Sequence, residues 1–219
     1  MKSNGDARPH EAFLLLLLLA AVACSPALAG RPLAVDDANV NEAGRGQLEV
    51  WVARGAGSTV FNLAPAYAPV EGLEFGALLA RESNTGDKVS ALQVKWRITA
   101  SKETGCNFGA VAGLSHAAER NTGYLNGLLT CNRPELGSVH FNLGATKPGG
   151  AARARSWGLA YEREIMGITP HLEWFGVEHA KPTLQAGVRG HVAPDLQLDG
   201  SVGRGDGVTL YTLGAKLGF

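Results

Sequence analysis

The chain has 219 residues, enough for one domain with a substantial core, and its 20 basic residues balance its 20 acidic ones. This balance argues against a nucleic-acid partner, because the chain has no excess of positive charge with which to hold phosphates. Glycine is abundant, at 29 residues, and only 18% of residues are charged. Such a composition suits many short strands joined by tight turns better than a helical protein.

The N-terminus has the pattern of an export signal. Two basic residues precede an apolar run over residues 13–23, and a small-x-small site predicts cleavage between Ala29 and Gly30. The run is too short to span a bilayer as a mature helix. Lipidation of Cys24 is an alternative, because the residues before it resemble a lipoprotein cleavage box. We therefore expect residues 1–29 to be a signal peptide.

From Gln47 onward the chain consists of alternating apolar and polar residues, broken at intervals by turn residues. A period of two indicates β-strands with one apolar and one polar face. Clusters such as "ESNTGD" and "GRGDG" mark the turns. We predict twelve strands and no helix, with the strands at 47–54, 59–67, 72–81, 88–99, 106–115, 122–131, 138–146, 155–164, 170–178, 182–190, 195–202 and 208–219.

The spacing of these strands favours an all-β transmembrane antiparallel barrel over residues 47–219. Each strand with its turn takes about 14 residues, which leaves room for the ~9–11 residues that a tilted membrane-spanning strand needs. A soluble sandwich usually repeats at ~8–12 residues. Closing the barrel pairs the last strand with the first, and it removes both free edges, which lipid would not tolerate.

The last strand also carries a recognisable terminal pattern. Tyr211, Leu217 and Phe219 share its apolar face, and nothing follows the final phenylalanine. This ending resembles the assembly signature of bacterial outer-membrane barrels. The resemblance implies that the barrel-assembly machinery inserts the chain, that its outer wall contacts outer-membrane lipid, and that the protein resides in the cell outer membrane.

A second resemblance lies at the start of the mature chain. Arg31-Pro32-Leu33, Asp36-Asp37-Ala38 and Gly46-x-Leu48-Glu49 resemble the opening of the MetA-pathway phenol-degradation family of outer-membrane transporters. The resemblance covers residues 31–50 only. It implies a barrel that passes small solutes, with apolar ones as one option, and it implies no catalytic residue.

Charged and histidine residues gather on the predicted inward faces, in the half of the barrel next to the periplasm. The opposite half of the predicted lumen is polar but uncharged. Because the charges are of both signs, we expect them to pair and brace the lumen. They are Glu49, Glu74, Lys95, Arg97, His140, Glu162, His171, Glu173, Arg189, Asp199 and Lys216.

Residues 30–46 lack strand periodicity but contain three carboxylates, those of Asp36, Asp37 and Glu42. We expect this segment to form a plug or gate at the periplasmic mouth, because such pairs are stronger in a confined lumen than at a surface. The expected partners of the carboxylates are Arg97, Arg189 and Lys216. The alternative is a solvated tether.

Cys106 and Cys131 are the two cysteines outside the signal. If the turn at 116–121 is the centre of a hairpin, the two residues lie directly opposite each other, within reach of a disulfide. The periplasm is oxidising, so we predict the bond. The alternative is a pair of independent small apolar residues.

Other motifs suggest chemistry only weakly. Asp37, Asn39 and Asn41 imitate the start of a calcium loop but lack its glycine and its final glutamate. Ser138, His140 and Asn142 share one strand face, as in a hydrolase, but successive same-face residues are ~6–7 Å apart. Arg204-Gly205-Asp206 forms an adhesion tripeptide in a turn. We therefore expect no metal and no cofactor.

The sequence favours an outer-membrane channel or transporter for small solutes over an enzyme. The first alternative is an outer-membrane barrel enzyme acting on lipids. The second alternative is a structural or adhesive barrel.

Overall fold

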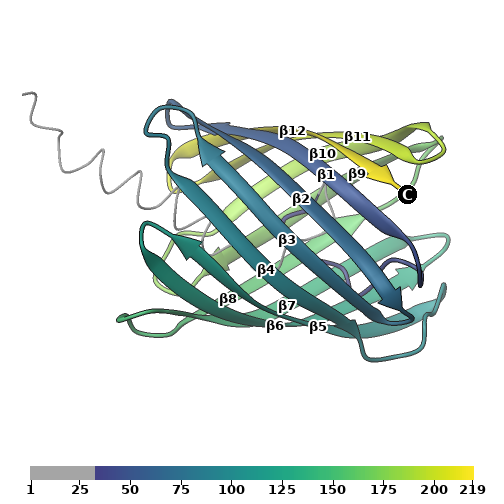
Figure 1. The fold of residues 1–219 in the computed structure, drawn as a ribbon. Coiled ribbons are helices and arrows are strands. Elements are labelled where there is room, and N and C mark those ends of the chain that lie inside the picture. The colour runs from purple at the N-terminus through teal and green to yellow at the C-terminus, as the bar shows by residue number, and fades with distance from the viewer. Residues whose placement is uncertain (1–32) are drawn as a thin grey trace, which may run out of the picture.

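The computed structural model describes residues 33–219, and the predicted cleavage site between Ala29 and Gly30 lies outside them. Twelve antiparallel strands form one closed barrel (Figure 1). All twelve predicted strands are confirmed, and their ends differ from the prediction by at most three residues. The strands are β1 (Gly46–Gly55), β2 (Ser58–Val70), β3 (Leu73–Glu82), β4 (Lys88–Arg97), β5 (Gly105–Ala117), β6 (Arg120–Arg133), β7 (Gly137–Pro148), β8 (Ala154–Glu162), β9 (Ile168–Val177), β10 (Thr183–Ala193), β11 (Leu196–Gly205) and β12 (Val208–Gly218).

The barrel closes where β1 pairs with β12, as the sequence predicts. In that register Leu48 lies opposite Leu217, and the backbones of Gly46 and Phe219 exchange two hydrogen bonds of 2.8 and 2.9 Å. With an even number of strands, β1 begins and β12 ends at the same end of the barrel. We call this end, marked by Gly46 and Phe219, the N/C rim, and the opposite end the far rim.

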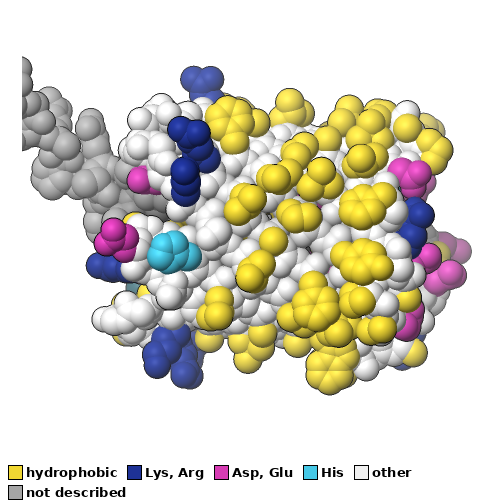
Figure 2. Space-filling view, viewed as in Figure 1, with side chains coloured by type: hydrophobic (Ala, Val, Ile, Leu, Met, Phe, Trp, Pro, Cys, Tyr) yellow, Lys and Arg dark blue, Asp and Glu magenta, His cyan; other side chains and the backbone are white. Residues whose placement is uncertain are grey.

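The outer wall of the barrel is apolar. Large hydrophobic side chains stand exposed along the strands, with Leu92 at 70% and Leu213 at 71% exposure. Figure 2 shows them spread over the visible wall, while charged side chains gather at the two ends. Soluble monomers rarely expose so large a continuous apolar surface, whereas a transmembrane barrel needs an apolar band. Residues 33–219 contain no helix of the length and apolar character that a membrane crossing requires.

The inner wall is mostly polar, because alternate residues of every strand face the lumen. Asn126, Asn142 and Glu173 are at most 1% exposed. Three small apolar clusters interrupt the polar lining. In one of them Trp51 packs on residues of β2, β3 and β4, and each of the other two includes residues that precede β1. The lumen is therefore a hydrogen-bonded interior that suits water and polar groups.

The closing seam gives a first testable prediction. Deleting Phe219 removes both of its backbone hydrogen bonds to Gly46, and it removes the aromatic ring that covers this glycine. We expect markedly less folded barrel, measured as the heat-modifiable band in unboiled gels. Phe219→Tyr keeps the ring and the backbone bonds and serves as the matched control. Equal yields of folded barrel from the deletion and the control would contradict the prediction.

Cys106 and Cys131 form a disulfide between β5 and β6, at the N/C rim, in the register that pairs the two residues directly. The bond closes a loop with a sequence separation of 25. We predict that the denatured, unreduced protein exposes no thiol to maleimide labelling, and that reduction exposes two per mature chain. For a loop of this size, losing the cross-link costs about 3 kcal/mol in the chain-entropy account. Labelling before reduction would overturn the prediction.

Candidate lumen site

Residues 33–41 lie inside the barrel, between the N/C rim and its middle, and residues 42–45 are exposed at that rim. We call residues 33–45 the lumen segment. Figure 1 shows this part of the chain, in purple, enclosed by the strands. Leu33 is 3% exposed, and Val35, Asp36 and Ala38 are fully buried. At its outer end the Gly44 N–H donates to the Ala68 carbonyl at 2.7 Å. The segment therefore occupies part of the lumen cross-section.

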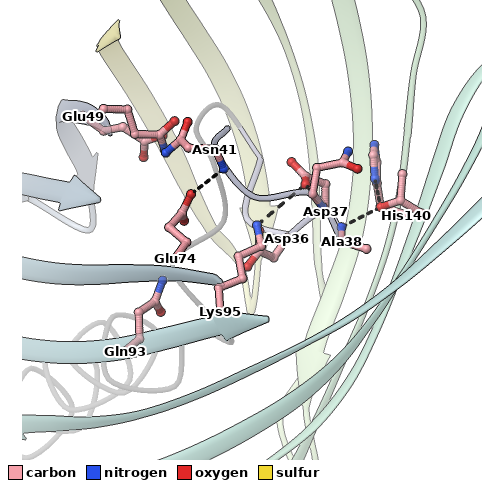
Figure 3. A network of polar contacts seen from close by, with 12 residues as sticks. Asp36, Asp37, Ala38, Asn41, Glu49, Glu74, Gln93, Lys95 and His140 are labelled. Atoms are coloured by element: carbon pink, nitrogen blue, oxygen red, sulfur yellow. Dashed lines mark hydrogen bonds and ion pairs between the residues drawn. The ribbon is translucent and has the colours of Figure 1, made fainter. Parts of the chain in front are cut away.

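One lysine of the wall binds two carboxylates of the lumen segment (Figure 3). The Nζ of Lys95, on β4, lies 2.7 Å from Oδ1 of Asp36 and 3.7 Å from Oδ1 of Asp37. Burial raises the pKa of the Asp36 carboxyl, and the adjacent ammonium opposes that rise. Burial also acts to raise the pKa of the Asp37 carboxyl, but nearby positive charges, Lys95 first among them, and the hydrogen bond from the Asn39 N–H together outweigh it, so the net shift is downward.

These partners differ from the three cations expected from the sequence. Arg97 pairs instead with Glu71 in the turn after β2, and Arg189 pairs with Glu162 at 2.9 Å. Lys216 faces Glu49 across the β1–β12 seam. Lys95 is the partner because it lies two residues farther from the N/C rim than Arg97, at the same depth in the lumen as the two aspartates. Glu42, the third expected plug carboxylate, is exposed.

Side chains of three more strands accept hydrogen bonds from the backbone of the lumen segment. Oε2 of Glu173, on β9, accepts from the N–H groups of Ala34 at 2.5 Å and Val35 at 2.8 Å. The Ala38 N–H donates to Oγ1 of Thr130 on β6 at 2.8 Å. The Asn41 N–H donates to Oε2 of Glu74 on β3 at 2.9 Å. The wall thus holds the segment from several sides through groups that every peptide carries.

Thr130 extends this contact into a chain of polar groups. Its hydroxyl lies 2.9 Å from Nδ1 of His140, and Nε2 of that histidine lies 3.4 Å from Oε1 of Glu162. Glu162 in turn accepts from Arg189. Because the Thr130 oxygen already accepts from the Ala38 N–H, its own hydrogen is available for the histidine. The segment is therefore connected to buried groups of β7, β8 and β10.

Two inward glycines make room for the lumen segment. A Cβ at Gly158 would lie 2.8 Å from Cγ2 of Val35, and one at Gly109 would lie 3.2 Å from the Ala38 carbonyl oxygen. Both distances are too short for an ordinary side-chain contact. Sequence reasoning missed these glycines and Thr130. The available signal was a glycine at an inward position of a strand, where close backbone approach is a common cause.

A cavity of about 660 Å³ lies between the lumen segment and the N/C rim. Its lining includes Asp37, Asn39 and Asn41 of the segment, and rim residues such as Gln47 and His191. The predicted lumen charges that line it are Glu49, Glu74, Lys95, His140, Glu162, Arg189 and Lys216. His171, Glu173 and Asp199 are buried in the wall, and the Arg97 side chain is 8% exposed.

The residues of the other candidate sites do not make the contacts that a hydrolase or a metal site would require. Oγ of Ser138 donates to Asn132 at 2.9 Å, while the contact of His140 Nδ1 is with Thr130. Thr130 is only 1% exposed beneath the lumen segment, so it is poorly placed to attack a lipid ester. Within residues 33–219 no group of three or more histidine, cysteine, aspartate or glutamate residues is arranged to hold a metal ion.

Comparison with known proteins places the chain in a family. The family model described as "Uncharacterised conserved protein UCP029691" matches residues 15–219, so the chain belongs to that family. The match does not show the MetA-pathway family that residues 31–50 resemble. No curated protein matches the chain.

Solved structures similar to the chain are outer-membrane barrels. A KdgM porin in complex with disordered oligogalacturonate is 9% identical, with a TM-score of 0.71 over 79% of this chain and 99% of that one. The COG4313 outer membrane channel from Pseudomonas putida F1 is 13% identical, with a TM-score of 0.57 over 84% and 98%. Omp33 of Acinetobacter baumannii is 7% identical, with a TM-score of 0.58 over 80% and 98%. The predicted fold, a barrel of the outer-membrane type, is confirmed.

Proposed function

We propose that this member of the family is an outer-membrane channel for small solutes, and that its lumen segment restricts the channel. The observation that carries the proposal is the polarity of the barrel, which is apolar outside and polar inside around a cavity of about 660 Å³ at the N/C rim. We assign the N/C rim to the periplasm, as the sequence-based topology does. The porins and the channel among its structural relatives support the proposal through their shared fold.

The chemistry of the cavity favours polar solutes. Its lining holds five carboxylates and three basic side chains besides two histidines. An apolar solute would have to displace water from these groups without replacing its hydrogen bonds, which is unfavourable. The resemblance of residues 31–50 to the MetA-pathway family argues for apolar solutes, and the lining of the cavity weighs against it.

Single-channel recording on the refolded mature protein tests the proposal. We expect discrete conductance steps in planar bilayers, with long closed periods because the lumen segment occupies the pore. Liposomes that contain the protein should also take up a small polar solute. A heat-modifiable, correctly folded barrel that leaves the bilayer and the liposomes tight would contradict the proposal and would favour a structural or adhesive barrel.

The enzyme alternative has less support. A serine hydrolase needs a hydrogen bond between nucleophile and base, together with access for the substrate. Ser138 is engaged with Asn132, and its side chain faces the lumen, away from lipid. The contacts of His140 with Thr130 and Glu162 are better explained as support for the lumen segment than as a catalytic set.

A further inference from the structure

We propose that the wall beneath the lumen segment is a binding site for short acidic peptides, which residues 33–41 of the chain themselves occupy. The ligand class is an extended peptide with a carboxylate side chain near its middle. The inference concerns binding, and it holds whether or not the barrel conducts.

The wall contacts groups that any peptide carries. Four backbone N–H groups, those of residues 34, 35, 38 and 41, donate to side chains of the wall. The acceptors are Glu173, Thr130 and Glu74, which come from three strands. Main-chain contacts of this kind give affinity for any extended peptide, while pockets select its side chains.

The wall also selects side chains. Lys95 receives the Asp36 carboxylate at 2.7 Å, so a carboxylate at this point replaces the water that the buried ammonium has lost. Gly158 leaves space for the branched Val35, and Gly109 lets the backbone of Ala38 approach the wall. The Ala38 side chain is fully buried against Val111 and Leu128, which leaves room only for a small residue there. A matching peptide therefore carries an apolar residue, then an acidic one, then a small one.

The barrel forms the site without a contribution from the segment to its sheet. The β1–β12 ladder closes the sheet, and the segment adds no strand to it. Covalently, the segment is joined to the wall through the single connection into β1. The adjacent cavity reaches from the rim to Lys95 and Glu74, which both lie in its lining, so a free peptide has a route to these two groups. Figure 3 shows the two side chains pointing toward the segment.

Because the lumen segment is tethered to the barrel, it occupies the site in preference to a free peptide. A short tether gives the attached segment an effective concentration on the order of mM, so a free peptide of equal affinity competes only above that level. Deleting residues 33–43 should expose the site to peptides at their intrinsic affinity.

The test measures binding of a fluorescent peptide with the sequence of residues 33–41 to the refolded barrel in detergent, by fluorescence anisotropy. The 33–43 deletion barrel should bind it, and the full chain should bind at least tenfold more weakly. A peptide carrying Asp36→Asn and Asp37→Asn should bind the deletion barrel at least tenfold more weakly than the natural sequence. Lys95→Gln in the deletion barrel should remove that difference.

Two results would overturn the proposal: a heat-modifiable deletion barrel that binds neither peptide at mM concentration, or equal binding of the acidic and amide peptides. If the deletion barrel does not fold, the full chain with Asp36→Ala and Asp37→Ala takes its place, since its own segment has lost the contact to Lys95. That barrel should bind the acidic peptide more tightly than the wild type does, and equal binding would refute the site. Because anisotropy needs no conductance, a non-conducting barrel that binds the peptide would refute only the channel.

Discussion

Deletion of residues 33–43 is expected to raise the ion conductance of the reconstituted barrel several-fold and to abolish its long closed periods. The deleted residues include Leu33, Val35, Asp36 and Ala38, all buried inside the lumen. Their removal joins the cavity at the N/C rim to the rest of the lumen. Gly44 stays in place, so its hydrogen bond to Ala68 at the start of the barrel is kept.

The matched control for the deletion is Asp195→Asn. It breaks the ion pair of Arg45 with Asp195 at the same rim, which is 3.3 Å long and exposed on both sides. Exposed pairs contribute about 0–1 kcal/mol, so this change should leave the conductance unaltered. Asp36→Ala with Asp37→Ala should give a smaller rise than the deletion. If a heat-modifiable deletion barrel has an unchanged conductance, residues 33–45 are only a tether and do not restrict the channel.

The barrel wall could be predicted from the sequence because the information is local. In β4, Leu92 and Val94 alternate with Gln93 and Lys95. One face of the strand contacts lipid and the other faces the lumen. The register of β5 and β6 follows from a short turn, which brings Cys106 opposite Cys131. Every predicted lumen charge faces inward, because successive residues of a strand alternate between the lipid face and the lumen face.

The contacts of the lumen segment could not be predicted in this way. Its partners lie far along the chain, 59 residues away for Lys95 and 138 for the bond from Val35 to Glu173. The segment has no period that would fix which side chains face which strand. The choice of Lys95 over Arg97 depends on how deep the segment reaches, which the sequence does not state. Gly158 is informative only once Val35 is placed beside it.

Lys95 should control how firmly the lumen segment is held. The ammonium forms ion pairs with two carboxylates of the segment, and the side chains of Lys95 and Asp36 are at most 5% exposed. Removing one member of a buried ion pair leaves the other charge desolvated, at a cost of about 3–5 kcal/mol. Lys95→Gln should therefore shift the equilibrium between docked and released segment by roughly 10²–10⁴-fold.

The measurement is the open probability in single-channel recordings, together with hydrogen exchange of the backbone N–H groups of residues 34, 35, 38 and 41. Both should rise in Lys95→Gln. Arg97→Gln is the matched control, because it removes the next inward cation of β4, whose partner Glu71 lies in a turn of the wall and not in the segment. Replacing both charges, with Lys95→Met and Asp36→Leu, should restore part of the docking, since an apolar pair of similar volume avoids the desolvation cost while Asp37 still loses its ion pair with Lys95. Equal effects of Lys95→Gln and Arg97→Gln, or a double variant as open as Lys95→Gln alone, would show that the segment is held by its backbone hydrogen bonds and not by this ion pair.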